Sequence, residues 1–405
     1  MMVPKLRLSL FKDDKSSSWY PANLGEIVEF KKGKGISKID ISNDGAYPCV
    51  RYGELYTIYN EKIDKVQSKT NCAPYEYVIS KSGDILIPAS GESAVDIARA
   101  SSILMDGVIL GGDINILTPK SNSLNSLFLS YSIVGRKKME LAKMAQGNSV
   151  VHLYSSQLKT LEIWIPLIDE QTKIADFLSS VDEKIKLLTQ QVVLLSQYRK
   201  GLVQNILSKK LRFKDENGKE FPDWNLVILG DYLIRHNEKS TENNQYPVLT
   251  SSREGIYFQK DYFNGEDIAS KNNIGYNVVP KGYFTYRHMS DDLVFKFNIN
   301  TLCDKGIVST LYPVFTTKLN AFFLQIKLNE GKEFRDYAIQ QKQGGSRTYM
   351  YYSKLESLKL MIPNTAEQTK IANLISAFDD KISAKKTELD KLKTWKYGLL
   401  QQMFV

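Results

Sequence analysis

The apolar positions of two long stretches, residues 165–206 and 362–403, recur at alternating steps of four and three residues. The first stretch places them at Ile174, Leu178, Val181, Ile185, Leu188, Val192, Leu195 and Leu202. The second stretch places them at Ile371, Ile375, Phe378, Ile382, Leu389, Leu392, Leu399 and Met403. This spacing is typical of the seam of a coiled coil, and it predicts two long helices with one apolar stripe each.

The two stretches are copies of each other, aligned without a gap. Glu170-Gln171-Thr172-Lys173 in the first matches Glu367-Gln368-Thr369-Lys370 in the second. Pro166 and Pro363 stand just upstream of the helices, where proline is tolerated. We expect each helix to have roughly 35 to 40 residues and a length of about 55 Å. Because either stripe alone would face water, each helix should bury it against the other.

The regions that precede the helices predict two mixed α/β domains. Strand-like runs in the first region are GEIVEF, YPCVRY, GDILIPA and GVILGGDINIL, separated by Gly, Asn and Ser turns. A helix is predicted over residues 124–144, followed by a polar loop, Gln146-Gly147-Asn148-Ser149. The predicted boundaries are 1–160 for the first domain, 161–210 for the first helix, 211–358 for the second domain and 359–405 for the second helix.

The two domains share a frame of matched short motifs. Lys5-Leu6-Arg7, Trp19, Leu24-Gly25-Glu26, Tyr47-Pro48, Gly83 and the Gln146 loop match Lys210-Leu211-Arg212, Trp224, Leu229-Gly230-Asp231, Tyr246-Pro247, Gly282 and Gln343-Gly344-Gly345-Ser346. The sequences between these motifs differ. Since turns and strand starts hold a fold while loops vary, the domains should share one scaffold and carry different surface chemistry.

The order of domain, helix, domain, helix constrains the assembly. For the second helix to bury its seam on the first, it must run back antiparallel. The repeat supports this arrangement, since Lys210-Leu211-Arg212 directly follows the first helix and Lys5-Leu6-Arg7 should therefore lie against the end of the second. We expect the two chain ends to meet, and a rod with a domain at each end related by an approximate two-fold axis.

Composition narrows the class of protein. The chain has 405 residues, a net charge of +9 and 42% hydrophobic residues, values that fit a folded protein with a polyanionic partner. Its three cysteines, Cys49, Cys72 and Cys303, are too isolated for a disulfide framework or a zinc site. The sequence predicts no membrane span and no signal peptide, so we expect a cytoplasmic protein.

Motifs of known catalytic chemistry are largely absent. The sequence has no phosphate-binding loop, no G-x-S-x-G elbow and no H-E-x-x-H pair, and His152, His236 and His288 lack acidic neighbours at metal-ligand spacing. His288 differs from the other two because it stands in Tyr286-Arg287-His288, where a loop after a strand could present it to a ligand.

Loops rich in Arg, Lys, Asn, Ser and Tyr favour nucleic-acid binding, since phosphates need cations and base edges need forked donors and acceptors. In the first domain the candidate DNA-binding residues are Lys31, Lys32, Lys34, Arg51, Tyr52, Ser90 and Arg99. In the second domain they are Arg235, Asn237, Ser252, Arg253, Arg287, His288, Arg347 and Tyr349. Taken singly, each is more often a solvated surface residue, but their recurrence at corresponding points strengthens the group.

With these motifs the chain resembles the specificity subunit of a type I restriction-modification system. The resemblance is carried by the repeated Leu-Gly-Glu/Asp turns, Gly83-Asp84-Ile85-Leu86, the Gln-Gly-x-Ser loops and the Ile-Pro…Glu-Gln-x-x-Ile-Ala helix starts, and it covers nearly the whole chain. Family helix starts often carry a Pro-Pro pair, whereas this chain has Ile165-Pro166-Leu167 and Ile362-Pro363-Asn364.

The resemblance implies a non-catalytic reader of double-stranded DNA. Two target-recognition domains would each read half of a split asymmetric site, with the antiparallel helices as the spacer. The chain would direct two methyltransferase subunits to adenines and, with restriction and translocase subunits, define sites for restriction. It would bind no cofactor itself, while the partner subunits would use S-adenosylmethionine, ATP and Mg.

Two other classes of function remain open. A self-contained DNA methyltransferase or nuclease with a fused specificity arm would need a cofactor pocket or a metal-binding carboxylate cluster. A structural coiled-coil tether would explain the helices but would leave the basic, divergent domains without a purpose. Lys385, Arg199 and Lys396 put charges on the helix seam, where they either set the register or mark where partner subunits dock.

The helix lengths generate a first prediction. If the helices separate the two half-sites, inserting four residues at matching points in both should lengthen the unspecified DNA spacer by one or two base pairs. The reason is geometric, since four residues add about 6 Å and a base pair about 3.4 Å. Methylome sequencing measures the spacer, and an unchanged spacer in an active complex would contradict the prediction.

Overall fold

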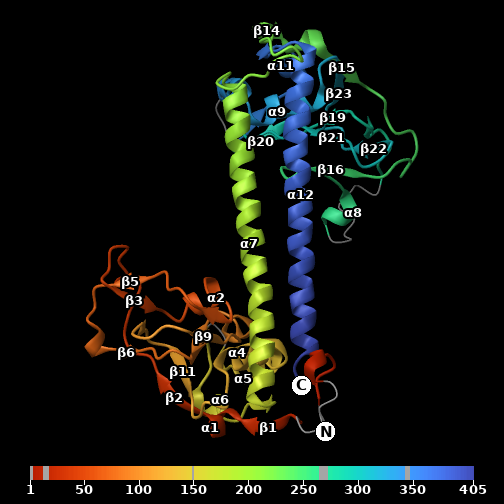
Figure 1. Ribbon diagram of the computed structural model, residues 1–405. Coiled ribbons are helices and arrows are strands. Elements are labelled where there is room, and N and C mark those ends of the chain that lie inside the picture. The colour runs from red at the N-terminus through yellow and green to blue at the C-terminus, as the bar shows by residue number, and fades with distance from the viewer. Residues whose placement is uncertain (1–2, 12–17, 148–149, 264–271, 343–346) are drawn as a thin grey trace. The chain divides into compact units, whose positions relative to one another are not determined.

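The computed structural model describes residues 3–11, 18–147, 150–263, 272–342 and 347–405, and it divides into two compact units (Figure 1). Unit 1 comprises Met1–Gln190 and Thr387–Val405, and unit 2 comprises Gln191–Lys386. Each unit therefore contains one globular domain and one end of each long helix. The predicted Gln146 and Gln343 loops lie largely outside the described residues.

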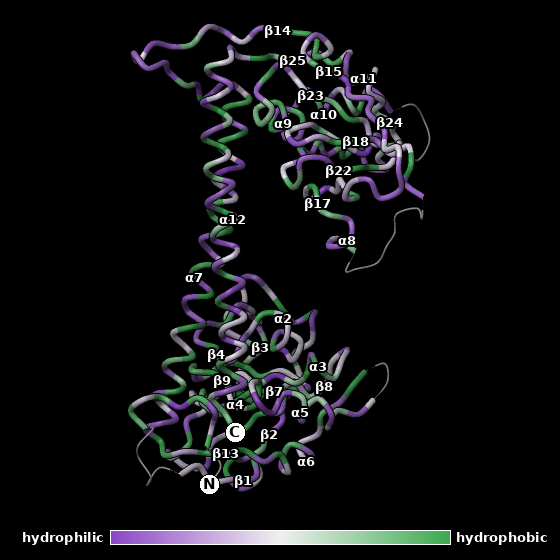
Figure 2. The backbone as a smooth tube through the Cα atoms, turned by 90° about the vertical axis from the view of Figure 1, so that its right-hand side faces the viewer, coloured by the Kyte–Doolittle hydropathy of each residue, from purple (hydrophilic) through white to green (hydrophobic). Residues whose placement is uncertain are grey.

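The two long helices are α7 (Ile168–Leu207) and α12 (Thr365–Gln402), with 40 and 38 residues, which confirms the lengths predicted from the seam. Figure 2 shows apolar and polar positions alternating along both. In the described residues no helix has an apolar stretch that could cross a membrane.

The helices pack antiparallel within each unit. In unit 1, Ile174 and Leu178 at the start of α7 share a core with Leu399 and Met403 at the end of α12. In unit 2 the directions are reversed, since the start of α12 packs against the last turns of α7. The predicted pairing of each seam with the other copy is therefore confirmed.

The described part of the unit 1 domain contains two stacked sheets and two short strand pairs. The five-stranded sheet has the order β2 (Val28–Lys32), β11 (Ile114–Pro119), β7 (Asp84–Pro88), β9 (Ser101–Ile103), β4 (Lys62–Ile63). The four-stranded sheet has the order β5 (Lys69–Thr70), β3 (Tyr47–Val50), β10 (Ile109–Leu110), β6 (Val78–Ile79). The pairs are β1 (Tyr20–Asn23) with β13 (Glu162–Ile165) and β8 (Ser90–Gly91) with β12 (Val151–His152).

The burial of β7 shows how these layers fit together. All five of its residues are buried, and successive side chains of a strand point to opposite faces. Ile85 and Ile87 pack into one core with the helices α4 (Ser126–Gly135) and α5 (Lys138–Met144), while Leu86 packs into a second core with Val50 and Leu110 of the other sheet. The shorter helices of unit 1 are η1 (Ser9–Phe11), α1 (Leu24–Ile27), α2 (Glu54–Thr57), η2 (Pro74–Glu76), α3 (Ala94–Ile97) and α6 (Ser155–Leu158).

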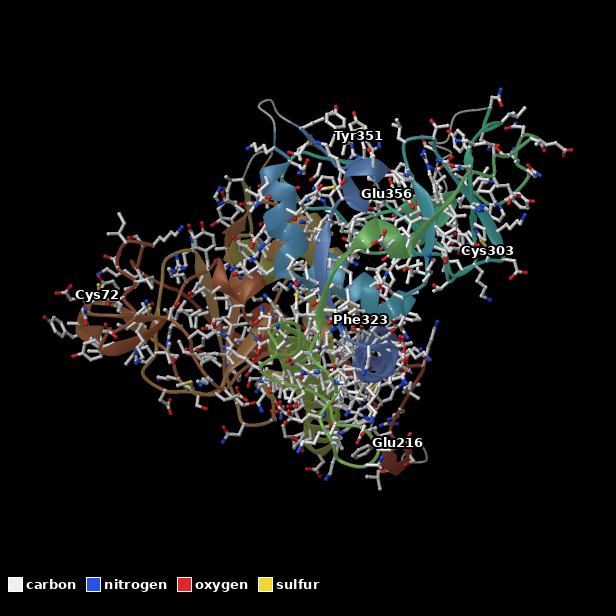
Figure 3. All side chains as sticks on the ribbon, turned by 90° about the horizontal axis from the view of Figure 1, so that it is seen from above. Cys72, Glu216, Cys303, Phe323, Tyr351 and Glu356 are labelled. Atoms are coloured by element: carbon white, nitrogen blue, oxygen red, sulfur yellow. The ribbon has the colours of Figure 1, made fainter. Side chains whose placement is uncertain are left out.

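The domain of unit 2 is built on a four-stranded sheet of order β15 (Leu233–His236), β23 (Val314–Thr317), β19 (Phe284–Thr285), β21 (Asn298–Ile299). Its strand pairs are β14 (Asn225–Ile228) with β25 (Lys359–Ile362), β16 (Leu249–Ser251) with β17 (Ile256–Phe258), β18 (Asn277–Pro280) with β22 (Lys305–Val308), and β20 (Met289–Ser290) with β24 (Thr348–Tyr349). Its helices are η3 (Leu229–Tyr232), α8 (Gln259–Tyr262), α9 (Ala321–Glu330), α10 (Lys332–Gln340) and α11 (Tyr352–Glu356). Phe284 stacks on Phe315 across the sheet at 4.9 Å, and Phe323 of α9 joins this core to α12 (Figure 3).

Three sequence predictions need correction. The helix predicted over residues 124–144 is two helices, α4 and α5; α4 ends at Gly135, whose carbonyl accepts from the side chain of Gln401 (3.1 Å). The run GEIVEF begins with the helical turn α1, where the Asn23 amide donates to Glu26. The run GVILGGDINIL is two strands in different sheets, since Asp113 adopts a left-handed conformation between them (φ 57°).

The matched motifs have matched structures. In both domains the leucine of the Leu-Gly motif donates its amide to an equivalent carbonyl, Leu24 to Leu161 (3.0 Å) and Leu229 to Leu358 (2.8 Å). The matched glycines Gly83 and Gly282 both have positive φ (94° and 82°), a conformation that residues with a side chain rarely adopt. These motifs repeat because they form the scaffold.

A buried glutamate at the start of α7 joins three parts of unit 1. Glu170 accepts two hydrogen bonds from the Arg7 guanidinium, both of 2.7 Å, and one from the Trp19 indole (3.4 Å). The next residue, Gln171, accepts from the amide of Asn125 (2.9 Å), the N-cap of α4. The N-terminal segment, the domain and α7 are therefore bonded at one point.

Unit 2 repeats this cluster. Glu367 at the start of α12 accepts from the Arg212 guanidinium (2.9 and 3.2 Å) and from the Trp224 indole (3.2 Å). Gln368 accepts from the amide of Asn320 (2.9 Å), the N-cap of α9. The sequence repeat therefore extends to individual hydrogen bonds.

The chain ends meet as predicted (Figure 1). The amide of Leu6 donates to the carbonyl of Gln402 at the end of α12 (2.8 Å). Its counterpart Leu211 donates to Asn205 near the end of α7 (3.1 Å), within the continuous chain. Each helix therefore ends in the same contact, although Leu6 and Gln402 come from opposite ends of the sequence whereas Leu211 and Asn205 are close in sequence.

The buried glutamate generates a stability prediction. Glu170→Gln should lower the free energy of unfolding by about 3 kcal/mol, because it removes a fully buried carboxylate charge that is paired with the nearly buried Arg7 guanidinium. The matched control is Glu183→Gln on the same helix, whose pair with Lys186 (3.3 Å) is exposed and worth about 0.5 kcal/mol or less. Urea unfolding followed by circular dichroism measures both, and equal losses in the two variants would contradict this account.

Candidate DNA-reading surfaces

The second domain gathers three of its candidate residues around one cavity. Ser252, Arg253 and Arg287 line a cavity of about 370 Å³, together with Lys296. Arg253 stands in the turn between β16 and β17, and Arg287 follows β19. Three cationic side chains at one opening suit a polyanion.

The hairpin that carries Arg253 is hydrogen-bonded at its base by the buried side-chain amide of Asn298. The side chain of Asn298 donates to Ser251 Oγ and to the Ser252 carbonyl, both at 2.8 Å. The turn itself is closed by the Ser252 amide, which donates to the Gly255 carbonyl (2.8 Å). The turn is therefore rigid at its base while Arg253 remains exposed.

Two neighbouring aspartates hold two of the candidate arginines. Arg253 donates both terminal nitrogens to Asp292 (2.7 Å each), and Arg347 donates Nε to Asp291 (2.9 Å). Hydrogen bonds from Arg253 and from Ser290 lower the pKa of Asp292 to about 2. All four partners are at least half exposed, so these pairs are weak and a phosphate or base edge could replace the aspartates.

A stack of aromatic rings lies beside Arg347. Tyr349 in β24 pairs with Met289 in β20, and its ring stacks on Tyr351 at 5.6 Å. Tyr351 is half exposed and lies at the edge of the domain, well away from α12 (Figure 3). His288 packs against Tyr351 at 5.4 Å and contacts the Leu311 carbonyl through Nδ1.

Arg235 and Asn237 stand apart from this group. Both are exposed, at the edge strand β15 or just beyond it, and neither lines the Arg253 cavity. The Arg235 guanidinium lies over the ring of Tyr352 at 5.3 Å, an attractive cation–π contact. The structure therefore divides the eight candidates of the second domain into two groups.

The basic run of the first domain lies beside the end of β3. Lys31 and Lys32 are exposed at the end of β2, and Lys34 follows them. Gly33 permits this approach, since a Cβ there would lie 1.9 Å from the Gly111 carbonyl. Gly111 in turn donates to the Val50 carbonyl (2.9 Å), directly before Arg51.

Arg51 and Tyr52 begin the turn that leads into α2. The Arg51 amide donates to the buried Glu54 carboxylate (2.8 Å), and the guanidinium contacts it at 3.5 Å. Among the described residues Arg51 Nε is buried without a hydrogen-bond partner, so the guanidinium keeps an unused donor. Tyr52 is exposed, with its ring 6.4 Å from that of Tyr56.

Ser90 and Arg99, the remaining candidates of the first domain, differ in burial. Ser90 is buried in β8, while Arg99 is half-buried with its Nε also unpartnered among the described residues. Burial and the nearby Arg99 guanidinium lower the pKa of Lys138 at the start of α5. Lys138, which sequence reasoning did not include, therefore lies near Arg99, with the carboxylates of Glu61 and Asp96 acting on it in the opposite direction.

The fifteen candidates differ in how far they are available to a ligand. Nine are exposed: Lys31, Lys32, Lys34, Tyr52, Arg235, Asn237, Arg253, Arg287 and Arg347. Arg51, Arg99, Ser252 and Tyr349 are half-buried, and Ser90 and His288 are buried. A base contact from Ser90 or His288 would need the surrounding strands to open.

Sequence reasoning missed Asp291, Asp292, Lys296 and Tyr351 in this domain. One signal was available for Tyr351, because the alternation in Tyr349-Met350-Tyr351 places both tyrosines on one face of an extended segment. The aspartates have no such signal, since their role depends on arginines that are remote in sequence. Within the described ranges, no group of His, Cys, Asp and Glu side chains could hold a metal ion.

Known proteins with similar sequences carry a shared description. The family described as "Type I restriction modification DNA specificity domain" matches residues 16–195 and 228–394. The MjaVIII type I restriction enzyme specificity subunit of Methanocaldococcus jannaschii is 22% identical, over 94% of this chain and 91% of that protein. The putative MjaX specificity subunit of the same organism is 25% identical, over 94% and 92%.

Solved structures share the fold. The type I restriction-modification S subunit from M. genitalium aligns over 100% of this chain and 99% of its own, with a TM-score of 0.62 and 16% identity. A chain from a structure of the type I R-M system covers 95% and 96%, with a TM-score of 0.52 and 16% identity. Since the family matches one region in each half and together these span most of the sequence, the chain belongs to the family of type I restriction-modification DNA specificity domains.

Proposed function

We propose that this chain is the DNA-reading subunit of a type I restriction-modification complex, in which each unit reads one half of a bipartite asymmetric site. The observation that carries the proposal is the contrast between scaffold and surface. The two domains repeat the same hydrogen bonds at Glu170 and Glu367, yet present different cationic loops. Two domains with the same scaffold and different surface loops suit a protein that reads two different DNA sequences with the same mode of attachment to its helices.

Lysines and arginines would have different roles in DNA binding. Exposed lysines in the first domain, such as Lys31 and Lys32, would neutralise phosphates and set affinity. The forked donors of Arg253, Arg287 and Arg347 would read base edges, with guanine the preferred partner of a bidentate arginine. Asp291 and Asp292 would hold two of these forks in extended positions before DNA arrives.

The chemistry would belong to partner subunits. Two methyltransferase subunits would supply S-adenosylmethionine chemistry, and translocase and nuclease subunits would use ATP and Mg. The chain itself would bind none of these cofactors. Its part is to hold the complex at one sequence, so reconstitution with methyltransferase subunits followed by methylome sequencing tests the proposal, and methylation at random adenines would contradict it.

Single arginine variants separate reading from affinity. Arg287→Ala or Arg347→Ala should relax or abolish recognition of one half-site, at a cost of about 1–3 kcal/mol for the native base. Lys31→Ala, the matched loss of one exposed cation, should weaken binding to all sequences and reduce the dependence of affinity on salt by about one charge. Methylome sequencing and salt titration of binding measure these effects; wild-type patterns in both arginine variants would show that other loops read the DNA.

A domain exchange tests independence. Replacing the first domain by that of a relative, joined just before Ile165, should change one half of the methylated sequence and leave the other half and the spacer intact. The reason is that base contacts would lie within each domain. If sequencing showed both halves altered in the chimera, the domains would be reading jointly.

A further inference from the structure

Arg199 on α7 and Lys396 on α12 occupy matched positions in the two copies of the helix. Their charges on the seam left two interpretations open, a device for register or a docking point for partners. The structure bonds each of them within its own unit, so they act inside the chain.

In unit 1, one ammonium group joins three elements. Lys396 Nζ donates to Asp182 Oδ1 on α7 (2.7 Å) and to Glu61 Oε2 in the domain (2.8 Å). The hydroxyl of Tyr131 on α4 donates to the other oxygen of Asp182 (2.7 Å). The Glu61 side chain is only 6% exposed and that of Lys396 14%, so the contact is shielded from water.

Burial alone would lower the pKa of Lys396, but the carboxylates of Glu61 and Asp182 raise it above the ordinary lysine value. The ammonium group therefore stays charged. A buried charge with two acceptors fixes the geometry of its partners, because moving either one leaves a charge without compensation.

In unit 2, a guanidinium group joins the corresponding elements. Arg199 donates Nε and Nη2 to Asp379 on α12 (2.8 and 3.2 Å). It donates Nη1 to both oxygens of Glu330, the last residue of α9 (2.5 and 2.7 Å). Each unit therefore has a clasp, meaning a helix cation bonded to an acid on the other helix and to an acid of the domain.

The two acids of each clasp differ in origin. The helix acids, Asp182 and Asp379, are matched positions of the repeat. The domain acids are not, since Glu61 lies in a loop between α2 and β4 while Glu330 ends a helix. Two divergent domains thus supply unrelated acids to one helix position. This is expected if the bond between helix and domain has a function of its own.

Each domain acid is connected to candidate reading loops. Glu61 follows the short helix α2, whose preceding turn carries Arg51 and Tyr52. Beside Glu330, the side chain of Asn329 bonds both the amide and the carbonyl of Phe297 (2.8 and 3.0 Å), at the end of the segment that begins with Asp291 and Asp292. A change in either clasp would therefore shift the base of a reading loop relative to the helices.

We propose that Lys396 and Arg199 are positioning residues, each of which sets the orientation of one recognition domain on its end of the helix pair. Through that orientation they set the separation of half-sites that the assembled complex accepts. This inference rests on the proposed function of the chain as a reader of bipartite DNA sites.

The test removes the negative charge of the domain acid in each clasp, which weakens the domain arm, meaning the bond from the helix cation to Glu61 or Glu330. Glu61→Gln and Glu330→Gln keep the shape of the side chain and leave the bonds to Asp182 and Asp379 in place. The complex reconstituted with methyltransferase subunits is given DNA with the native spacer or with one base pair more or fewer. The ratio of native to altered methylation rates should fall about tenfold in both variants, with the half-site sequences unchanged.

Two further variants serve as a conservative replacement and a control. Lys396→Arg keeps a cation within reach of both acids and should retain most of the wild-type ratio. Lys393→Met removes an exposed charge one turn away on α12 and should leave the ratio unchanged. If Glu61→Gln lowers the yield of folded chain, Glu61→Asp, which keeps the charge and shortens the arm, is measured in its place with the same expected direction.

The outcomes distinguish the inference from the function beneath it. A lower melting temperature with a wild-type spacer ratio in the domain-arm variants would show a merely structural role and overturn the inference. A wild-type complex that methylates no bipartite site would instead refute the proposed function. A reduced ratio in the two domain-acid variants, together with a ratio close to wild type in Lys396→Arg, supports both.

Discussion

A buried carboxylate at the first turn of each long helix is the interaction on which the rest of the structure depends. Glu170 and Glu367 lie where the helix dipole favours negative charge. Each accepts hydrogen bonds from an arginine and a tryptophan of the segment that precedes its domain in the sequence. Because an unpaired charge at such a site is costly, the helix, the domain and the preceding segment must assemble together. The adjacent glutamine extends the same constraint to the N-terminus of a domain helix.

This constraint explains how the domains diverge without losing their attachment. The arginine and tryptophan bonded to each buried carboxylate are repeated, whereas the sheets are not: within the described residues the main sheet has five strands in unit 1 and four in unit 2. The cationic loops stand on these unmatched parts. The loops can therefore vary without changing the clusters that fix each domain to the helices. The clasps at Lys396 and Arg199 form a second link between each domain and the helices.

Periodicity determined which features the sequence could predict. The two long helices and their antiparallel pairing follow from a repeated seam, and the meeting of the chain ends follows from a repeated tripeptide. Features that depend on one contact between remote segments left no such pattern. The bond from Gln401 to the end of α4 and the pairing of Asp292 and Asp291 with Arg253 and Arg347 are recognised only in the folded chain. The burial of His288 is of the same kind, because strand pairing rather than the residue's own loop encloses it.

The division of unit 1 into two remote segments has a consequence for biosynthesis. Leu399, Leu400, Met403 and Phe404 complete a core with Trp19 and Phe128, yet they are synthesised only after the whole of unit 2. Unit 2 is continuous in sequence and meets no such delay. During translation the domain of unit 1 therefore keeps part of its apolar core exposed until the end of α12 is made. Unit 2 can complete its own core before that point. Limited proteolysis of ribosome-bound chains would reveal this inverted order as protection of the later domain before the earlier one.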